Sequence, residues 1–506
     1  MSSKKLQHPW IRHLYRLSKN FSSYNRHDSF IEPQPHDSVA AFERASVCDR
    51  PLWRGKLNAK GGNTLPYDLV IKNARLVNEG TIIEGDLAIE SGRIVQIGGS
   101  LSAANELDAV GSWLIPGMID DQVHFREPGF EHKGSIETES RAAIAGGVTS
   151  YMEMPNSNPQ TTNAEALQRK YDRAAKHSFA NYGFYLGATN DNLEDIKSID
   201  PSSACGIKVF MGASTGNMLV DDPDTLNGIF SSAPVLIATH CENTPMILAN
   251  EARAREQFGS DVPFIEHANI RSAEACYASS SFAVELARTH GARLHILHLT
   301  TAREMDLFNP GPIEAKRITA EACVHHLFCN DSWYATRGAD IKCNPAIKRS
   351  SDQEALLAAV VEDRIDVIAT DHAPHTVEEK AQPYFDAPAG LPLVQHALLT
   401  LIEHVKNGVM SIEKVVQKTA HAPAQLFDVS RRGYLREGYW ADLVIIDPDR
   451  ETVVNDEPIY AKCGWSPFNG LTFRSRITHT LVNGKLVYED GELIGDSPAM
   501  ALAYER

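Results

Sequence analysis

The sequence predicts an α/β fold: a closed (β/α)8, TIM-like barrel with a small β-sandwich domain built from both ends of the chain. Three observations lead to this prediction. Apolar segments alternate with helical patterns through the middle of the chain, and short strands of alternating polarity flank that middle on both sides. Polar residues also collect at the ends of the apolar segments. A chain of 506 residues is too long for one small core.

Residues 1–65 differ from the rest of the chain. They are rich in Arg, Lys, Ser and Asn and show no sustained periodicity. We expect a weakly ordered extension that adds nothing to a functional site. A mitochondrial transit peptide is the alternative, but acidic residues such as Asp28, Glu32 and Asp37 count against it.

A β domain is expected from two distant segments. Short alternating strands begin at Asp68, in "DLVIKNARLV", "GTIIEGDLAIE" and "GRIVQIG". The same alternation of apolar and polar residues recurs in "ADLVIIDP" and "THTLVNGKLVYEDGELIG". We therefore assign residues 66–113 and 432–506 to one composite β domain and residues 114–431 to the barrel.

Eight barrel strands are expected, separated by helical stretches such as "ETESRAAIAGG" and "SSSFAVELARTHG". In chain order the strands are "LIPGMIDDQVH", "VTSYMEMPN", "ANYGFYLGA", "GIKVFMGA", "PVLIATHCE", "RLHILHLT", "RITAEACVHH" and "DVIATDHAPH". Eight βα units close into a parallel barrel, whose active site lies at the C-terminal ends of the strands.

Composition excludes several classes of protein. A formal charge of −16 argues against a general nucleic-acid binder, and no apolar run approaches a membrane span. The eight cysteines form no CxxC pair, so reduced thiols and a cytoplasmic location are expected. A small-molecule substrate and a homo-oligomer, for example a dimer, complete this expectation.

Five groups at the ends of predicted strands suggest a metal centre. They are His124, Lys208, His240, His298 and Asp371, on strands 1, 4, 5, 6 and 8. A single His at a strand end is more often a hydrogen-bonded structural residue. Five such groups on one rim favour a ligand set, and imidazole with carboxylate suits zinc or a similar divalent ion.

Lys208 has two interpretations. In "GIKVFMG" it lies within an apolar strand, where a buried charge is costly. It either pairs with a carboxylate or is held neutral and adds CO2, giving a carbamate that bridges metals.

Arg126 is the first candidate for substrate binding. It lies two residues after His124, so a period of two points both side chains into the barrel mouth. Its guanidinium suits a carboxylate bound through two hydrogen bonds. An ion pair with Glu127 or Glu131 is the alternative.

Asn156 and His375 are further candidates. Asn156 lies in "MPNSNP", where it could equally serve a turn, and His375 follows Asp371 by four residues. His325 and His326, in "CVHHLF", are treated as structural.

Taken together, these motifs resemble a known family. "DDQVHFREPG", "MPNSNP", "GIKVFMGAS", "THCEN", "HILHLTTA" and "ATDHAPHT" are similar to segments of the dihydroorotases, in the cyclic amidohydrolase superfamily. "KCGWSPFNG" resembles that family's closing segment, and the resemblance runs from about Asp68 to Leu493. "MPN" favours dihydroorotase over allantoinase and dihydropyrimidinase.

The resemblance implies a role for each candidate. His124 would bind the more buried of two zinc ions, His240 and His298 the second, and carboxylated Lys208 would bridge them. Asp371 would be both a ligand and the general acid/base. The substrate carboxylate would be held by Arg126, Asn156 and His375.

The implied reaction is the reversible hydrolysis of dihydroorotate to N-carbamoyl-L-aspartate in pyrimidine biosynthesis. A metal-bound hydroxide would attack the ring amide, and Asp371 would pass the proton to the departing nitrogen.

Gln122 departs from the family pattern. The family has His at this position, and an amide oxygen is a poorer zinc ligand than imidazole. We expect the buried metal to be held weakly or to be absent, giving one or two ions per chain. Two other functions stay open: a related cyclic amidase acting on hydantoin, dihydropyrimidine or allantoin, and a metal-deficient, non-catalytic partner of aspartate transcarbamoylase.

Overall fold

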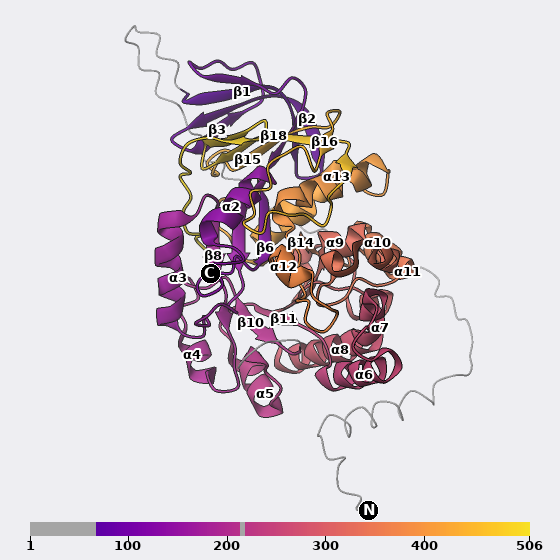
Figure 1. Ribbon diagram of the computed structural model, residues 1–506. Coiled ribbons are helices and arrows are strands. Elements are labelled where there is room, and N and C mark those ends of the chain that lie inside the picture. The colour runs from indigo at the N-terminus through magenta and orange to yellow at the C-terminus, as the bar shows by residue number, and fades with distance from the viewer. Residues whose placement is uncertain (1–66, 213–217) are drawn as a thin grey trace, which may run out of the picture. The chain divides into compact units, whose positions relative to one another are not determined.

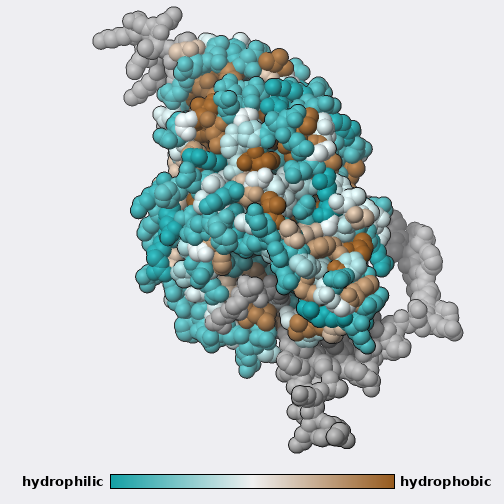
Figure 2. Space-filling model, in the orientation of Figure 1, coloured by the Kyte–Doolittle hydropathy of each residue, from teal (hydrophilic) through white to brown (hydrophobic). Residues whose placement is uncertain are grey.

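The computed structural model describes residues 67–212 and 218–506. The predicted N-terminal extension, residues 1–65, lies outside the described residues and stays a prediction. Within the described ranges no helix is long and apolar enough to cross a membrane. Hydrophilic residues cover most of the face seen in Figure 2, and hydrophobic residues form small groups between them.

A mixed sheet joins the two ends of the described chain, shown in indigo and yellow in Figure 1. Its strands run in the order β20-β19-β18-β15-β5-β1-β2-β3, with β4 paired to β1. The strands are β1 (Leu69–Asn78), β2 (Thr81–Glu90), β3 (Arg93–Ile97), β4 (Glu106–Asp108), β5 (Trp113–Pro116), β15 (Leu443–Asp447), β18 (Arg476–Val482), β19 (Lys485–Glu489) and β20 (Glu492–Leu493). A sheet domain from both chain ends is confirmed, as one continuous hydrogen-bonded sheet. The exact boundaries 66–113 and 432–506 stay a prediction.

The hairpins of this sheet follow from their turn residues. Each is closed by a two-residue loop ending in glycine, and both residues of each loop have positive φ. The loops are Glu79-Gly80, Ser91-Gly92, Asn483-Gly484 and Asp490-Gly491. Such loops match the right-handed twist of antiparallel strands, which explains why the strands pair with their sequence neighbours.

The barrel strands occur in all eight predicted places. They are β6 (Met118–Val123), β7 (Val148–Glu153), β8 (Asn181–Phe184) with β9 (Leu186–Gly187), β10 (Ile207–Phe210), β11 (Ile237–His240), β12 (Leu294–Ile296), β13 (Ile318–Cys323) and β14 (Val367–Ala369). Neighbouring strands pair in parallel, and the third strand is interrupted only at Tyr185.

Helices follow the barrel strands and surround them in Figure 1. The longer ones are α2 (Ile136–Ala145), α3 (Ala164–His177), α5 (Pro223–Ser232), α6 (Thr244–Phe258), α8 (Ala273–His290), α11 (Ser350–Val361) and α13 (Ala397–Lys406). Side chains cap several N-termini by accepting a backbone N–H, as Ser135, Asn163 and Asp222 do. These caps fix where each strand-to-helix loop ends.

Contacts between β6 and the end of β14 close the barrel. The His124 amide donates to the His372 carbonyl at 2.7 Å. Asp120, with a fully buried side chain, accepts from the Thr370 amide at 3.1 Å and from its hydroxyl at 2.6 Å. Because the first and last strands are joined here, residues near 120 and near 370 lie side by side.

Replacing Asp120 tests this closure. In Asp120→Ala two buried donors of Thr370 lose their acceptor, so we expect a loss of about 2–4 kcal/mol in the free energy of unfolding. Asp120→Asn keeps one acceptor oxygen and should cost less. Urea unfolding of the full chain measures both. Equal stability of Asp120→Ala and the unchanged protein would contradict the assignment.

Candidate active site

The first pair of predicted site residues meets at the barrel closure. His124 Nε2 lies 3.1 Å from Asp371 Oδ1, although the residues are far apart in sequence. Asp371 has a φ of 51°, and His298, across the site, has a φ of 39°. Left-handed backbone at non-glycine residues is uncommon and tends to occur at functional sites. Both residues directly follow a barrel strand, where the chain turns away from the sheet.

The second pair consists of His240 and His298. His240 Nδ1 lies 2.9 Å from His298 Nε2, and both side chains are buried. His240 Nε2 lies 3.0 Å from Glu242 Oε2, and Glu242 also pairs with Arg271. Burial lowers the pKa of both imidazoles, so both rings are neutral near pH 7.

Lys208 interacts electrostatically with both pairs. Its side chain is 1% exposed, and its ammonium lies 4.6 Å from the centre of the Phe210 ring. Burial lowers the pKa of Lys208 to about 8, despite the opposing charge of Asp371. The Lys208 charge in turn acts on His124, His240, His298 and Asp371. Lys208 is therefore within electrostatic range of all four other predicted ligands.

The hydrogen bonds around these residues leave the atoms that could bind a metal facing one another. His124 Nδ1 donates to Asn156 Oδ1 at 2.8 Å, so the neutral ring turns its Nε2 lone pair toward the Asp371 carboxylate. His240 donates through Nε2 to Glu242, so its Nδ1 accepts from His298 Nε2 when no metal is bound, and both nitrogens are available to a metal. At the His124–Asp371 contact a lone pair faces a carboxylate, and a cation between them would stabilise this arrangement. The residues present thus fit a divalent metal.

Gln122 takes part in the site as a hydrogen-bond donor. Its Nε2 donates to Asp371 Oδ1 at 3.1 Å, and its Oε1 faces the Cys323 thiol at 3.7 Å. Burial opposes ionisation of Asp371, yet the neighbouring His124 and Lys208 outweigh it and lower the pKa. Gln122 therefore contacts a proposed ligand without directing its own oxygen at the cluster.

Arg126 and His375 lie together at the edge of the site. Arg126 Nη2 lies 3.0 Å from His375 Nε2, and Lys133 Nζ lies 3.1 Å from His375 Nδ1. Lys133 also pairs with Glu379 at 2.9 Å. Burial lowers the pKa of Arg126 only to about 10, so its guanidinium stays charged at pH 7. Glu379, which also lies 3.4 Å from His375, offsets the charge of Lys133, so Arg126 supplies the net positive charge of this surface, which we call the cationic edge (Arg126, Lys133 and His375).

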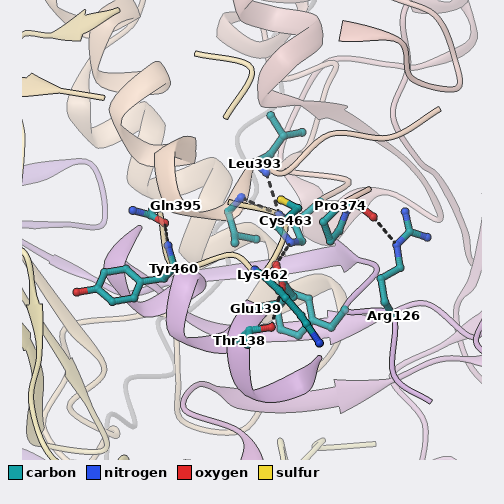
Figure 3. Close-up of polar contacts among 12 residues, drawn as sticks. Arg126, Thr138, Glu139, Pro374, Leu393, Gln395, Tyr460, Lys462 and Cys463 are labelled. Atoms are coloured by element: carbon teal, nitrogen blue, oxygen red, sulfur yellow. Dashed lines mark hydrogen bonds and ion pairs between the residues drawn. The ribbon is translucent and has the colours of Figure 1, made fainter. Parts of the chain in front are cut away.

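Hydrogen bonds fix Arg126 and the neighbouring Glu139 (Figure 3). Arg126 Nε donates to the Pro374 carbonyl at 3.0 Å. His372 accepts from the Leu393 amide at Nδ1, so its Nε2 donates to Glu139 at 2.8 Å. Glu139 also accepts from the Lys462 amide at 3.0 Å. Helix α2, the end of β14 and the C-terminal segment therefore share one buried carboxylate.

Several residues of the site were missed from sequence. Lys133, Glu139, His372 and Glu242 lie outside the predicted set. Glu242 follows His240 by two residues and could have been predicted together with it.

His325, expected to be structural, is buried beside Asp371, and neither of its ring nitrogens has a hydrogen-bond partner among the described residues. Its ligand atoms lie within 4.8 Å of those of Cys323 and His326. Asn156, expected to contact substrate, orients His124.

Known proteins resemble this chain over most of its length. A model of the Amidohydrolase family matches residues 113–487. A dihydroorotase of Methanothermobacter thermautotrophicus is 31% identical over 434 residues, which is 85% of this chain and 96% of the relative. An allantoinase of Bacillus velezensis is 32% identical over 84% of this chain and 95% of the relative.

The fold has solved counterparts as well. The L-hydantoinase (dihydropyrimidinase) of Arthrobacter aurescens superposes with a TM-score of 0.80 at 26% identity, covering 86% of this chain and all of that structure. The matched family segment spans the barrel and every site residue described above. On its sequence, its fold and the ligand cluster at its strand ends, the chain belongs to the amidohydrolase family.

Proposed function

We propose that this chain is a dihydroorotase, a metal-dependent enzyme that reversibly hydrolyses the cyclic amide of dihydroorotate to N-carbamoyl-L-aspartate. One observation carries the proposal: the cationic edge joins the proposed ligand cluster through Arg126, which follows His124 by two residues. Dihydroorotate carries a carboxylate beside its cyclic amide, so one molecule can engage both parts of the site.

The metal would be held by His124, His240, His298, Asp371 and Lys208, and we propose zinc. A bound divalent ion supplies Lewis acidity toward the amide carbonyl and acidifies water. Lys208, with its pKa of about 8, has a neutral fraction near pH 7 that can add CO2. The resulting carbamate would have two oxygens for ligation. His124 is partly buried, and the other four side chains are buried, so little water competes for the metal.

Asp371 is proposed to move the proton. Its lowered pKa keeps the carboxylate ionised at neutral pH, so it can take a proton from water. In hydrolysis the carbonyl carbon gains the hydroxyl, the ring C–N bond breaks, and Asp371 returns the proton to the ring nitrogen. Gln122 and His124 contact the same oxygen of Asp371, which leaves the other oxygen for this transfer.

The cationic edge selects the substrate. Allantoin and unsubstituted hydantoin lack a carboxylate, so they would leave the charge of Arg126 without a partner in a partly dehydrated site. The allantoinase relative makes allantoin the second candidate, and substrate preference separates the two. A cytoplasmic location and a homo-oligomeric state remain expectations from sequence.

Turnover of dihydroorotate by metal-loaded protein is the first test. We expect hydrolysis of dihydroorotate and little of allantoin or hydantoin. Arg126→Gln removes a charge-assisted contact to the carboxylate and should lower kcat/KM by about 100-fold. Arg169→Gln is the matched control, since Arg169 is half-exposed on α3 and pairs with Glu165 there. Faster turnover of allantoin than of dihydroorotate would refute the substrate assignment.

Lys208 provides a second test. If it carries a bridging carbamate, Lys208→Ala should lose metal and nearly all activity, and short carboxylic acids should restore part of both. Metal content and turnover are measured with and without added acetate. An unmodified lysine in the mass spectrum or electron density of the active, metal-loaded protein would contradict the bridge.

Gln122 provides a third test, because its oxygen is turned toward Cys323. We expect the position nearest His124 to be less occupied than the His240/His298 position and to lose metal first to a chelator. The loss of an imidazole ligand should cost at least the roughly 10–100-fold in affinity typical of losing an outer contact. Gln122→His should raise metal content per chain. Two tightly held ions in the unchanged protein would show that another group replaces the missing ligand.

A further inference from the structure

A second polar cluster lies inside the barrel, separate from the donor atoms assigned above. Asp121 comes from β6, His295 from β12 and Glu321 from β13, and all three side chains are 0% exposed. His295 pairs in register with Ala238, which pairs with Lys208. His295 and Lys208 therefore project from the same face of the barrel wall.

Among the described residues, four ligand-type atoms of this cluster face one another without forming a hydrogen bond of normal geometry. They are both carboxylate oxygens of Asp121, Nε2 of His295 and Oε2 of Glu321. Buried polar atoms are almost always paired, so four orphans in one place need an explanation. Three of them are carboxylate oxygens, whose burial without compensation is especially costly.

The spacing of these atoms fits a metal ion. His295 Nε2 lies 3.3 Å from Asp121 Oδ2 and 3.6 Å from Glu321 Oε2. In a tetrahedral zinc site with bonds of about 2.0–2.2 Å, neighbouring ligand atoms lie about 3.3–3.6 Å apart. Both distances from His295 match that geometry, and all three ligand atoms lie within 4.8 Å of one another.

The tautomer of His295 agrees with this geometry. The Thr319 hydroxyl donates to the Leu294 carbonyl at 3.2 Å, so its oxygen accepts from His295 Nδ1 at 2.8 Å. Nδ1 thus holds a proton, and Nε2 is the nitrogen that faces Asp121 and Glu321. Without a metal, burial opposes the charge of His295, but these two carboxylates outweigh it and raise the pKa of His295 to about 9; a metal ion would take the place of that proton on Nε2. A histidine that binds metal through one nitrogen typically donates from the other in this way.

Charge balance points the same way. With both carboxylates ionised and the imidazole neutral, the three side chains would carry a charge of −2, which one divalent ion neutralises. We propose that Asp121, His295 and Glu321 bind a further divalent metal ion, zinc or a similar first-row ion, within the barrel. The ligand set is one imidazole and two carboxylates, with the second oxygen of Asp121 able to complete four-coordination.

Full burial gives this ion a distinct signature. It would enter during folding and leave only on unfolding, so it should resist a chelator that strips the proposed catalytic position. After native dialysis of the full-length protein against EDTA, we expect Asp121→Asn and His295→Gln each to retain about one ion per chain less than the unchanged protein. Elemental analysis by mass spectrometry measures this independently of activity.

The matched control is Glu304→Gln. Glu304 is also a buried carboxylate, but the Thr301 hydroxyl donates to it at 2.8 Å, and it lies outside both proposed sites. This variant should retain the same metal as the unchanged protein. Equal metal in Asp121→Asn and the unchanged protein would overturn the proposal, and would favour a protonated His295 between two carboxylates.

If the variants do not fold, crystals of the unchanged protein decide the question. Anomalous scattering at the zinc edge should give a peak within bonding distance of Asp121, His295 and Glu321. A zinc-loaded crystal with peaks only at the His240/His298 cluster would overturn the proposal. Neither readout depends on dihydroorotate turnover, so the result stands apart from the proposed function.

Discussion

Closure of the barrel between β6 and β14 is the constraint on which the site depends. The His124 amide bonds to the His372 carbonyl, and Asp120 accepts both Thr370 donors. These contacts bring residues about 250 positions apart in sequence into one wall, so that His124 faces Asp371 and Arg126 faces His375. Without closure the ligand cluster and the cationic edge would belong to separate pieces of sheet.

Burial then decides the protonation states in the cluster. It lowers the pKa of His124, His240 and His298, which are neutral and therefore able to offer lone pairs. Glu242 shows the opposite balance: burial opposes its charge, but Arg271 and His240 hold its pKa at about 2. An ionised Glu242 accepts from His240 Nε2 and so fixes which nitrogen faces His298. One carboxylate outside the cluster thus orients a ligand inside it.

Much of the fold could be predicted from sequence because its signals are local. Runs of apolar residues gave the eight barrel strands, and the X-Gly pairs explain the hairpins. The strand-end residues were found because a parallel barrel gathers strand ends on one rim. Glu139, His372 and Lys133 were missed for the converse reason. Their importance comes from contacts across more than 200 residues, which no local pattern records.

Two adjacent residues of β6, Asp121 and Gln122, contact two different buried clusters. On β6 the Gln122 amide donates to Asp371, so a hydrogen-bond donor stands where the family pattern has an imidazole. The next residue back, Asp121, turns a carboxylate toward His295 and Glu321. Register shifts against β7 on either side of Asp120 allow adjacent residues of β6 to face the interior together. Strand β6 thus places a neutral amide beside Asp371 and a negative charge beside His295. The stability of that charge depends on what neutralises it, because a buried carboxylate without a partner costs several kcal/mol.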